Sequence, residues 1–138
     1  MADNLGGART VNMTVAMVFG AIYTLVGIAG FFVTDNFIGQ EGGSLLGFQV
    51  NHLHSIVHLL IGLALLAASR SHAAARSANL AIGVTYLALG VIGPFLTGTE
   101  ANIIALNAAD HWLHIASGLV LAGVGAFADK GARDRTHA

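Results

Sequence analysis

Long apolar stretches, separated by short polar segments, dominate the sequence. Each has at least roughly the 20 residues that a helix needs to cross a bilayer. Asp110 is the only charged residue inside them. The pattern therefore predicts four transmembrane helices, at about residues 10–33, 44–69, 77–96 and 102–128.

The composition agrees with a membrane protein. Apolar residues make up 55% of the chain and charged residues only 9%, whereas soluble domains carry about 25% charged residues. The net charge of −1 gives no electrostatic footprint for nucleic acid. The sequence has no cysteine, which excludes a thiolate metal site. We therefore expect a single transmembrane domain over residues 1–138, with the lipid bilayer as a partner.

The basic residues predict how the chain is oriented. Lysine and arginine occur before the first apolar stretch, between the second and third, and after the fourth. These residues are Arg9, Arg70, Arg76, Lys130, Arg133 and Arg135. The other two connections contain acidic residues but no lysine or arginine. Because cytoplasmic loops are enriched in basic residues, we expect both termini in the cytoplasm.

The first and third stretches share the pattern G-x-x-Y-x-x-x-G-x-x-G. Its residues are Gly20, Tyr23, Gly27 and Gly30 in the first stretch, and Gly83, Tyr86, Gly90 and Gly93 in the third. Glycines on one face of a membrane helix let a neighbouring helix approach closely, so helix packing is their expected role. The two tyrosines are expected either to offer hydroxyls to a polar centre or simply to pack.

The second and fourth stretches share another pattern, N-x-x-[H/D]-x-x-x-H-[L/I]-x-x-G. Its residues are Asn51, His54, His58 and Gly62 in the second stretch, and Asn107, Asp110, His114 and Gly118 in the fourth. The two patterns together define helix-pair repeats at about 18–69 and 81–128. Both repeats begin on the cytoplasmic side, so they are parallel. We predict an all-α, up-down-up-down four-helix bundle built from them.

Ionisable side chains inside a span are costly, so those of the second pattern need an explanation. One hypothesis is a metal site. Residues at i and i+4 lie one above the other on a helix, so each of the two helices can offer a pair of ligands. The candidates are His54, His58, Asp110 and His114, with His111 as a further one. Imidazole and carboxylate suit zinc, iron, copper or manganese.

A second hypothesis is haem b. His58 and His114 occupy equivalent positions in the two repeats, as two axial ligands on facing helices would. No haem-attachment motif is present in the sequence, so this hypothesis rests on symmetry. A chlorophyll-type pigment bound by histidine is an alternative of the same kind.

Two further hypotheses need no cofactor. Chains of Asp and His within spans are typical of proton relays, so a proton-coupled transporter or channel is one. The other is a purely structural hydrogen-bond network. In that case Asn51 and Asn107 are helix N-caps, and Asp110 completes a variant capping box with Asn107.

The chain resembles a bacterial family of four-span membrane proteins that is known only as a domain of unknown function. The resemblance lies in the N-x-x-H-x-x-x-H motif that begins at Asn51, in the span with Tyr86 and Gly90, and in the Asp110/His114 pair. It covers most of residues 10–128. The resemblance implies a compact bundle in a bacterial plasma membrane, and it implies no activity.

We therefore expect a small integral membrane protein that binds a transition metal or haem between the second and fourth spans. Its role would be electron transfer or metal handling, as an accessory subunit of a larger membrane complex or as a homo-oligomer. A non-catalytic structural or assembly subunit is the alternative, and a proton-coupled transporter or channel is third. Because the sequence has no nucleophile–base pair, phosphate loop or paired carboxylate, we do not expect hydrolase or transferase chemistry.

Overall fold

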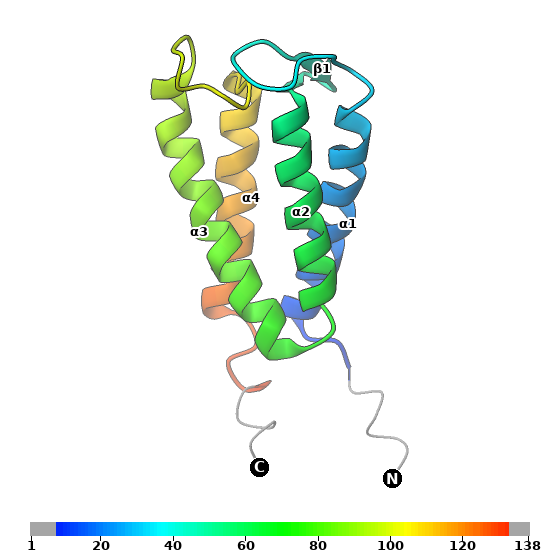
Figure 1. The fold of residues 1–138 in the computed structure, drawn as a ribbon. Coiled ribbons are helices and arrows are strands. Elements are labelled where there is room, and N and C mark those ends of the chain that lie inside the picture. Colours follow the sequence, from blue (N-terminus) through cyan, green and yellow to red (C-terminus); the bar gives the residue numbers. More distant parts are fainter. Residues whose placement is uncertain (1–7, 133–138) are drawn as a thin grey trace.

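The computed structural model describes residues 8–132, and most of them are helical. Its elements, in chain order, are α1 (Val11–Gly30), β1 (Gly43–Leu45), β2 (Phe48–Val50), α2 (His52–Ala68), α3 (His72–Leu96) and α4 (Ala108–Phe127). The four helices lie side by side (Figure 1). Within the bundle, α1 packs mainly against α2, and α3 packs mainly against α4.

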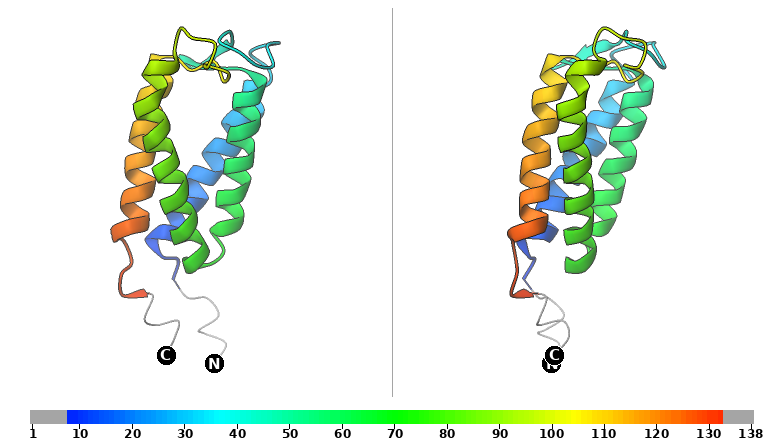
Figure 2. Two further views of the ribbon diagram at one scale, coloured as in Figure 1. Left: turned by 60° about the vertical axis from the view of Figure 1, so that its left-hand side comes forward. Right: turned by 90° about the vertical axis from the view of Figure 1, so that its left-hand side faces the viewer.

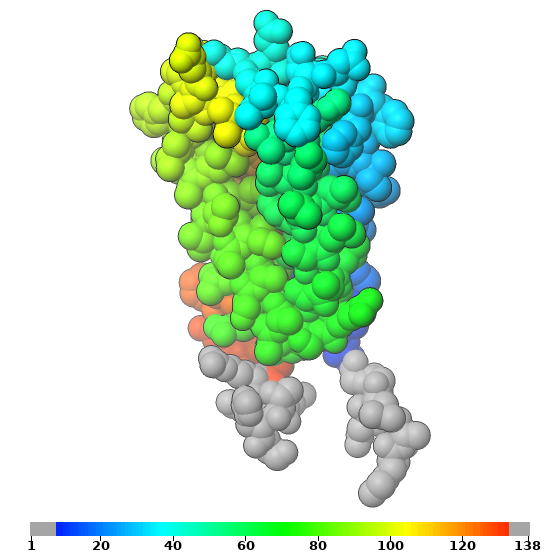
Figure 3. Space-filling view, viewed as in Figure 1, coloured from blue at the N-terminus to red at the C-terminus, as the bar shows by residue number. Residues whose placement is uncertain are grey.

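The two ends of the bundle carry different connecting segments. The connections from α1 to α2 and from α3 to α4 lie at one end, which also holds the strands (Figures 1 and 2). We call it the hairpin end. The short turn from α2 to α3, the start of α1 and the end of α4 lie at the other end, which we call the turn end. The space-filling view shows the connecting segments covering the hairpin end (Figure 3).

Each helix begins at a residue whose side chain accepts a hydrogen bond from the backbone three residues on. These N-caps are Thr10, Asn51, Ser71 and Asn107. At Asn107 the bond is reciprocal, because the Asp110 side chain accepts from the Asn107 backbone N–H at 2.9 Å. Such caps satisfy backbone donors that have no partner inside the helix, and each stabilises it by about 1 kcal/mol.

The helix boundaries differ from those of the apolar stretches. The range 44–69 begins with a β-hairpin, and α2 starts only at His52. The hairpin turn uses Leu46 and Gly47, with φ of 54° and 90°, which is the positive-φ pair that tight two-residue hairpin turns require. By contrast, α3 begins earlier than the predicted stretch 77–96, directly after its Ser71 cap. Arg76 is therefore helical and does not lie in a loop.

Within residues 8–132, two helices, α1 and α3, are long and apolar enough to cross a membrane. Helix α2 is also apolar but has 17 residues. The large side chains on the outside of the helices are apolar, among them Leu25, Ile28, Leu60, Leu63, Val91, Leu119 and Trp112. Many buried residues are polar, among them Asn12, His54, His58, Asn79, Asp110, His114 and Ser117. This distribution is the reverse of that in a soluble bundle.

Glycines lie where the paired helices meet. A Cβ atom at Gly20 would lie 2.8 Å from the backbone nitrogen of Leu66 on α2. A Cβ at Gly118 would lie 2.8 Å from the backbone nitrogen of Leu87 on α3. Real Cβ contacts are not this short, so these backbones approach as closely as only glycine allows.

At the turn end, Asp129 connects the end of α4 to the start of α1. Its carboxylate accepts hydrogen bonds from the backbone of Val11 at 3.1 Å and from the backbone and side chain of Asn12 at 2.8 and 2.9 Å. Asn12 in turn accepts from the side chain of Asn79 on α3. Burial alone would raise the pKa of Asp129, but the bonds from Asn12 and Val11 outweigh it and lower the pKa below its ordinary value.

Candidate functional site

Three histidines meet in the interior near the hairpin end. His54 and His58 come from α2, and His114 comes from α4. The His54 and His58 ring centres are 4.4 Å apart, and the His114 ring lies 5.9 Å from the first and 6.2 Å from the second. One ring nitrogen of each lies within 4.8 Å of the corresponding nitrogens of the other two. We call these residues the three-histidine cluster.

The local sequence explains how α2 supplies two of the three rings. His54 and His58 are one helical turn apart, so their side chains leave the same face. Asn51 fixes the start of that turn, since its side-chain oxygen accepts from the His54 backbone at 2.9 Å. The Asn51 amide also donates to the backbone carbonyls of Gly39 and Ile103, at 3.0 and 2.8 Å. The cap therefore ties α2 to both connections at the hairpin end.

The cluster is buried, and most of its ring nitrogens lack protein partners within the described residues. His54 and His114 are 1% exposed and His58 is 5% exposed. Within residues 8–132, neither ring nitrogen of His54 has a hydrogen-bond partner, and the same is true of His58 Nε2 and His114 Nδ1. A buried polar atom without a partner costs about 1–3 kcal/mol, and such atoms are rare in native proteins. Four in one cluster call for a ligand.

Two tyrosines pack against the cluster from α1 and α3. The Tyr86 ring stacks on His114 with centres 5.2 Å apart and planes 8° apart, and the Tyr23 ring centre lies 5.1 Å from that of His58. The two tyrosine rings also contact each other, at 5.2 Å. The Tyr23 hydroxyl donates to Ser117 on α4 at 2.6 Å, whereas the Tyr86 hydroxyl has no partner within the described residues.

Asp110 and His111 do not belong to the cluster. The capping box turns Asp110 towards the α4 N-terminus, where Oδ2 accepts from the Asn107 backbone. His111 bonds to the Thr97 hydroxyl through Nε2 at 2.9 Å, and its ring lies against Gly93 of α3. The structure therefore does not bring Asp110 together with the histidines as a four-ligand set. It brings together the three imidazoles of His54, His58 and His114.

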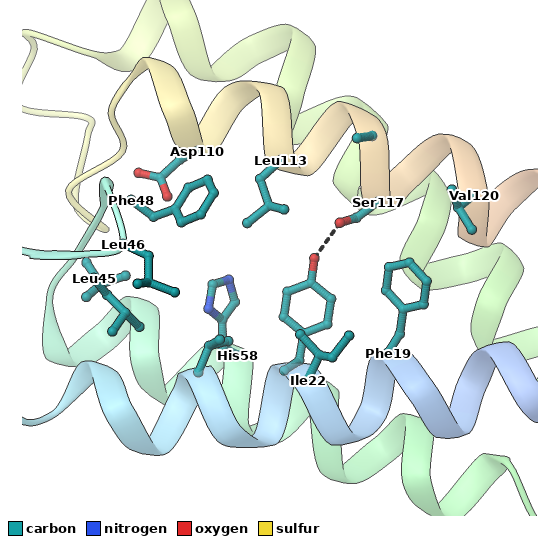
Figure 4. A pocket seen from close by; sticks show the side chains of 14 residues that line it. Phe19, Ile22, Leu45, Leu46, Phe48, His58, Asp110, Leu113, Ser117 and Val120 are labelled. Carbon is teal, nitrogen blue, oxygen red and sulfur yellow. Dashed lines mark hydrogen bonds between the residues drawn. The ribbon is translucent and has the colours of Figure 1, made fainter.

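A cavity of about 400 Å³ lies beside the cluster, between α1 and α4 (Figure 4). Most of its lining is apolar and comes from α1, α4 and the β-hairpin. Its ionisable lining residues are His58, Asp110 and Tyr23. The sequence patterns do not predict this cavity, because lining residues such as Phe48 and Ser117 belong to neither pattern. Ser117 also has no polar counterpart in the first repeat, where the corresponding residue is Ile61.

The fold and the cluster define a class: residues 8–132 are mostly helical and form four helices, two of them long and apolar enough to span a membrane, with buried histidines at one end. The chain belongs to the family described as Domain of unknown function (DUF4383), whose model matches residues 13–127. This match confirms the resemblance to a family of unknown function. Neither the curated proteins nor the solved structures contain a match to the chain.

Proposed function

We propose that the protein is an integral membrane protein whose four helices all cross a bacterial plasma membrane. The outward apolar side chains and the buried polar ones support this placement, because lipid favours that arrangement. The basic residues Arg9, Arg70, Arg76 and Lys130 lie at the turn end or within the first turns of α3. The positive-inside rule then assigns the turn end and both termini to the cytoplasm. The three-histidine cluster lies in the non-cytoplasmic half of the membrane.

We further infer that the bundle consists of two parallel repeats in up-down-up-down order. Contacts at equivalent positions support the repeats. Gly62 of α2 lies against Gly20 and Thr24 of α1, as Gly118 of α4 lies against Gly83 and Leu87 of α3. Both α2 and α4 begin at an asparagine cap.

We propose that the three-histidine cluster binds one transition-metal ion. The observation that carries this proposal is the convergence of three buried imidazoles, four of whose ring nitrogens have no protein partner within residues 8–132. Imidazole ligands suit zinc, copper and iron, and manganese is less well supported because Asp110 is not in the set. Three protein ligands leave a coordination position open, which is typical of functional sites and unusual in structural ones. The ion would serve metal handling or electron transfer, in a protein that acts alone or as an accessory subunit.

Haem is less well supported than a single ion. A porphyrin would have to enter between His58 and His114, but the rings of His54, Tyr23 and Tyr86 already pack around these two. A purely structural network is also less well supported, because the cluster histidines show no hydrogen bonds to one another among the described residues.

Metal analysis of the native protein tests the proposal. Protein purified without chelators should carry about one transition-metal ion per chain, and His54→Ala, His58→Ala and His114→Ala should each lose it. His111→Ala is the matched control, since His111 bonds to Thr97 outside the cluster and should leave the metal content unchanged. A Soret band lost with His58 or His114 would instead favour haem. Wild type that holds neither metal nor haem, even after reloading with zinc, copper and iron, would overturn the proposal.

A further inference from the structure

The cavity between α1 and α4 opens to the outside of the bundle. These two helices contact each other much less than the helices within each pair do. Ile22 on α1 and Val120 on α4 both line the cavity and are 49% and 45% exposed. Given the membrane placement proposed above, the opening faces lipid. A ligand would therefore enter sideways, from the bilayer.

One wall of the cavity is polar. Asp110 is 1% exposed, and its Oδ1 atom has no hydrogen-bond partner within residues 8–132. Figure 4 shows its carboxyl group and the His58 ring directed towards the same space, beside Phe48 and Leu46 of the hairpin. The capping box occupies Oδ2 and the Gln49 backbone lies near the carboxyl group, but Oδ1 makes no hydrogen bond within the described residues and can bind a ligand. An ionised Oδ1 accepts from a hydroxyl, and a protonated one donates to a carbonyl.

The lining also restricts the charge of the ligand. Neither lysine nor arginine lines the cavity, and its acidic residue is Asp110. A phosphate headgroup would find no cation there and would be repelled by an ionised carboxylate. The remaining lining is almost wholly apolar, and the volume of about 400 Å³ lies in the range of small-molecule sites. The ligand is therefore largely apolar and carries no anionic group, and a head with hydroxyl or carbonyl oxygens matches the two protonation states of Asp110.

We propose that this cavity binds a lipid-soluble quinone or quinol. The ring head lies at the hairpin end with one oxygen on Asp110 Oδ1 and one face near His58. The apolar tail runs between Ile22 and Val120 into the lipid. Since His58 also belongs to the three-histidine cluster, the head would lie beside the metal position. The proposal rests on the membrane placement and requires no metal to be present.

Binding can be tested with the full chain in phospholipid nanodiscs, with ubiquinone-1 and its quinol as probes. A photoactivatable azido analogue of ubiquinone should label peptides of α1, α4 or the β-hairpin, and ubiquinone-1 should compete. Ala116→Phe places a large ring in the cavity and should weaken competition at least tenfold. The matched control is Ala88→Phe, at an exposed position of α3 outside the cavity, which should bind like wild type.

Asp110→Asn tests recognition of the head. The asparagine oxygen can still accept from the Asn107 backbone, so the cap is preserved, but the quinol hydroxyl loses a charged acceptor. We expect at least tenfold weaker quinol binding. Labelling equal in all variants, labelling outside the cavity, or a phospholipid retained there against excess ubiquinone-1 would each overturn the proposal. Metal content measured in the same samples distinguishes a failure of the quinone proposal from a failure of the metal proposal. Ala116 is not in the three-histidine cluster, so Ala116→Phe should keep the metal content of wild type.

Discussion

Tyr86 stacks on His114 with the two ring planes 8° apart and their centres 5.2 Å apart. The contact joins α3 to the α4 member of the three-histidine cluster and fixes the plane of that ring. Because the His114 ring is already held in place, it would lose little conformational freedom on binding a metal. The site is therefore preorganised. The tyrosine acts through its ring face, and its hydroxyl makes no hydrogen bond within the described residues.

Removing only the Tyr86 hydroxyl should therefore cost little. Tyr86→Phe keeps the stacked ring and deletes an unpartnered buried polar atom, so we expect an unfolding free energy equal to that of wild type or about 1 kcal/mol higher. Tyr86→Ala should lower it by about 3–5 kcal/mol, because it leaves a cavity. Thermal unfolding of both variants in the same detergent measures the difference. Loss of bound metal in Tyr86→Phe would contradict this role and would make the hydroxyl a ligand.

The glycine contacts predict opposite effects at two positions of one helix. Gly118→Ala should destabilise the bundle by at least about 1 kcal/mol, because its Cβ would meet the Leu87 and Gly83 backbones at 2.8 Å. Gly123→Ala should be neutral or stabilise by up to about 1 kcal/mol, since a Cβ there meets nothing within 4 Å and alanine favours a helix. Unfolding in detergent compares the two. Equal effects would mean that α3 and α4 do not approach as described.

Asp129 predicts a pH-dependent contribution to stability at the turn end. Its folded-state pKa is lower than the ordinary 3.8, so its stabilising effect is complete above the unfolded-state pKa and is lost as the pH falls through the folded-state pKa. Asp129→Asn should lower the unfolding free energy at pH 7 by about 1 kcal/mol, because the amide keeps one acceptor oxygen but loses the second acceptor and the negative charge beside the α1 N-terminus. The difference from wild type should shrink towards zero as the pH falls through the folded-state pKa of Asp129.

Melting temperatures from pH 7 to pH 2 measure this difference. Asp35→Asn, at an exposed acidic position, is the control and should match wild type throughout. A difference for Asp129→Asn that grows as the pH falls would contradict the proposed role of the hydrogen bonds from Val11 and Asn12.

The absence of cysteine allows a clean test of topology. Ala101→Cys places one thiol at the hairpin end, and Ala73→Cys places one near the turn end, both at exposed positions. A membrane-impermeant maleimide should label the first in intact spheroplasts and the second only after lysis, because the basic residues place the turn end in the cytoplasm. Labelling of both from outside, or the reverse order, would contradict the four-span arrangement or its orientation.

Local chemistry in the sequence anticipates much of the helical framework. Asn51 and Asn107 mark the start of α2 and α4, and spacing of four residues puts His54 and His58 on one face. Spacing on a helix does not determine which way a side chain turns. Asp110 shares a face with His114, yet its bond to the Asn107 backbone holds its carboxyl group at the helix terminus, outside the three-histidine cluster.

Other features have weak sequence signals. The β-hairpin lies inside a stretch without charges, so hydrophobicity alone extends the predicted helix through it; the turn at Leu46 and Gly47 depends on positive φ angles. The cavity depends on the distance between α1 and α4, and this distance is set by how the α1/α2 pair packs against the α3/α4 pair. A single sequence does not encode that distance in any short motif.

X-ray absorption at the metal edge of the native, metal-loaded protein tests the central claim most directly, because it reports the atoms bound to the ion. We predict a first shell with three imidazole nitrogens, at about 2.0–2.1 Å if the metal is zinc. A remaining ligand should be oxygen from water or a small molecule, and His114→Ala should lose the ion. A shell of oxygen atoms alone, or the four equatorial nitrogens of a porphyrin, would contradict binding by the three-histidine cluster.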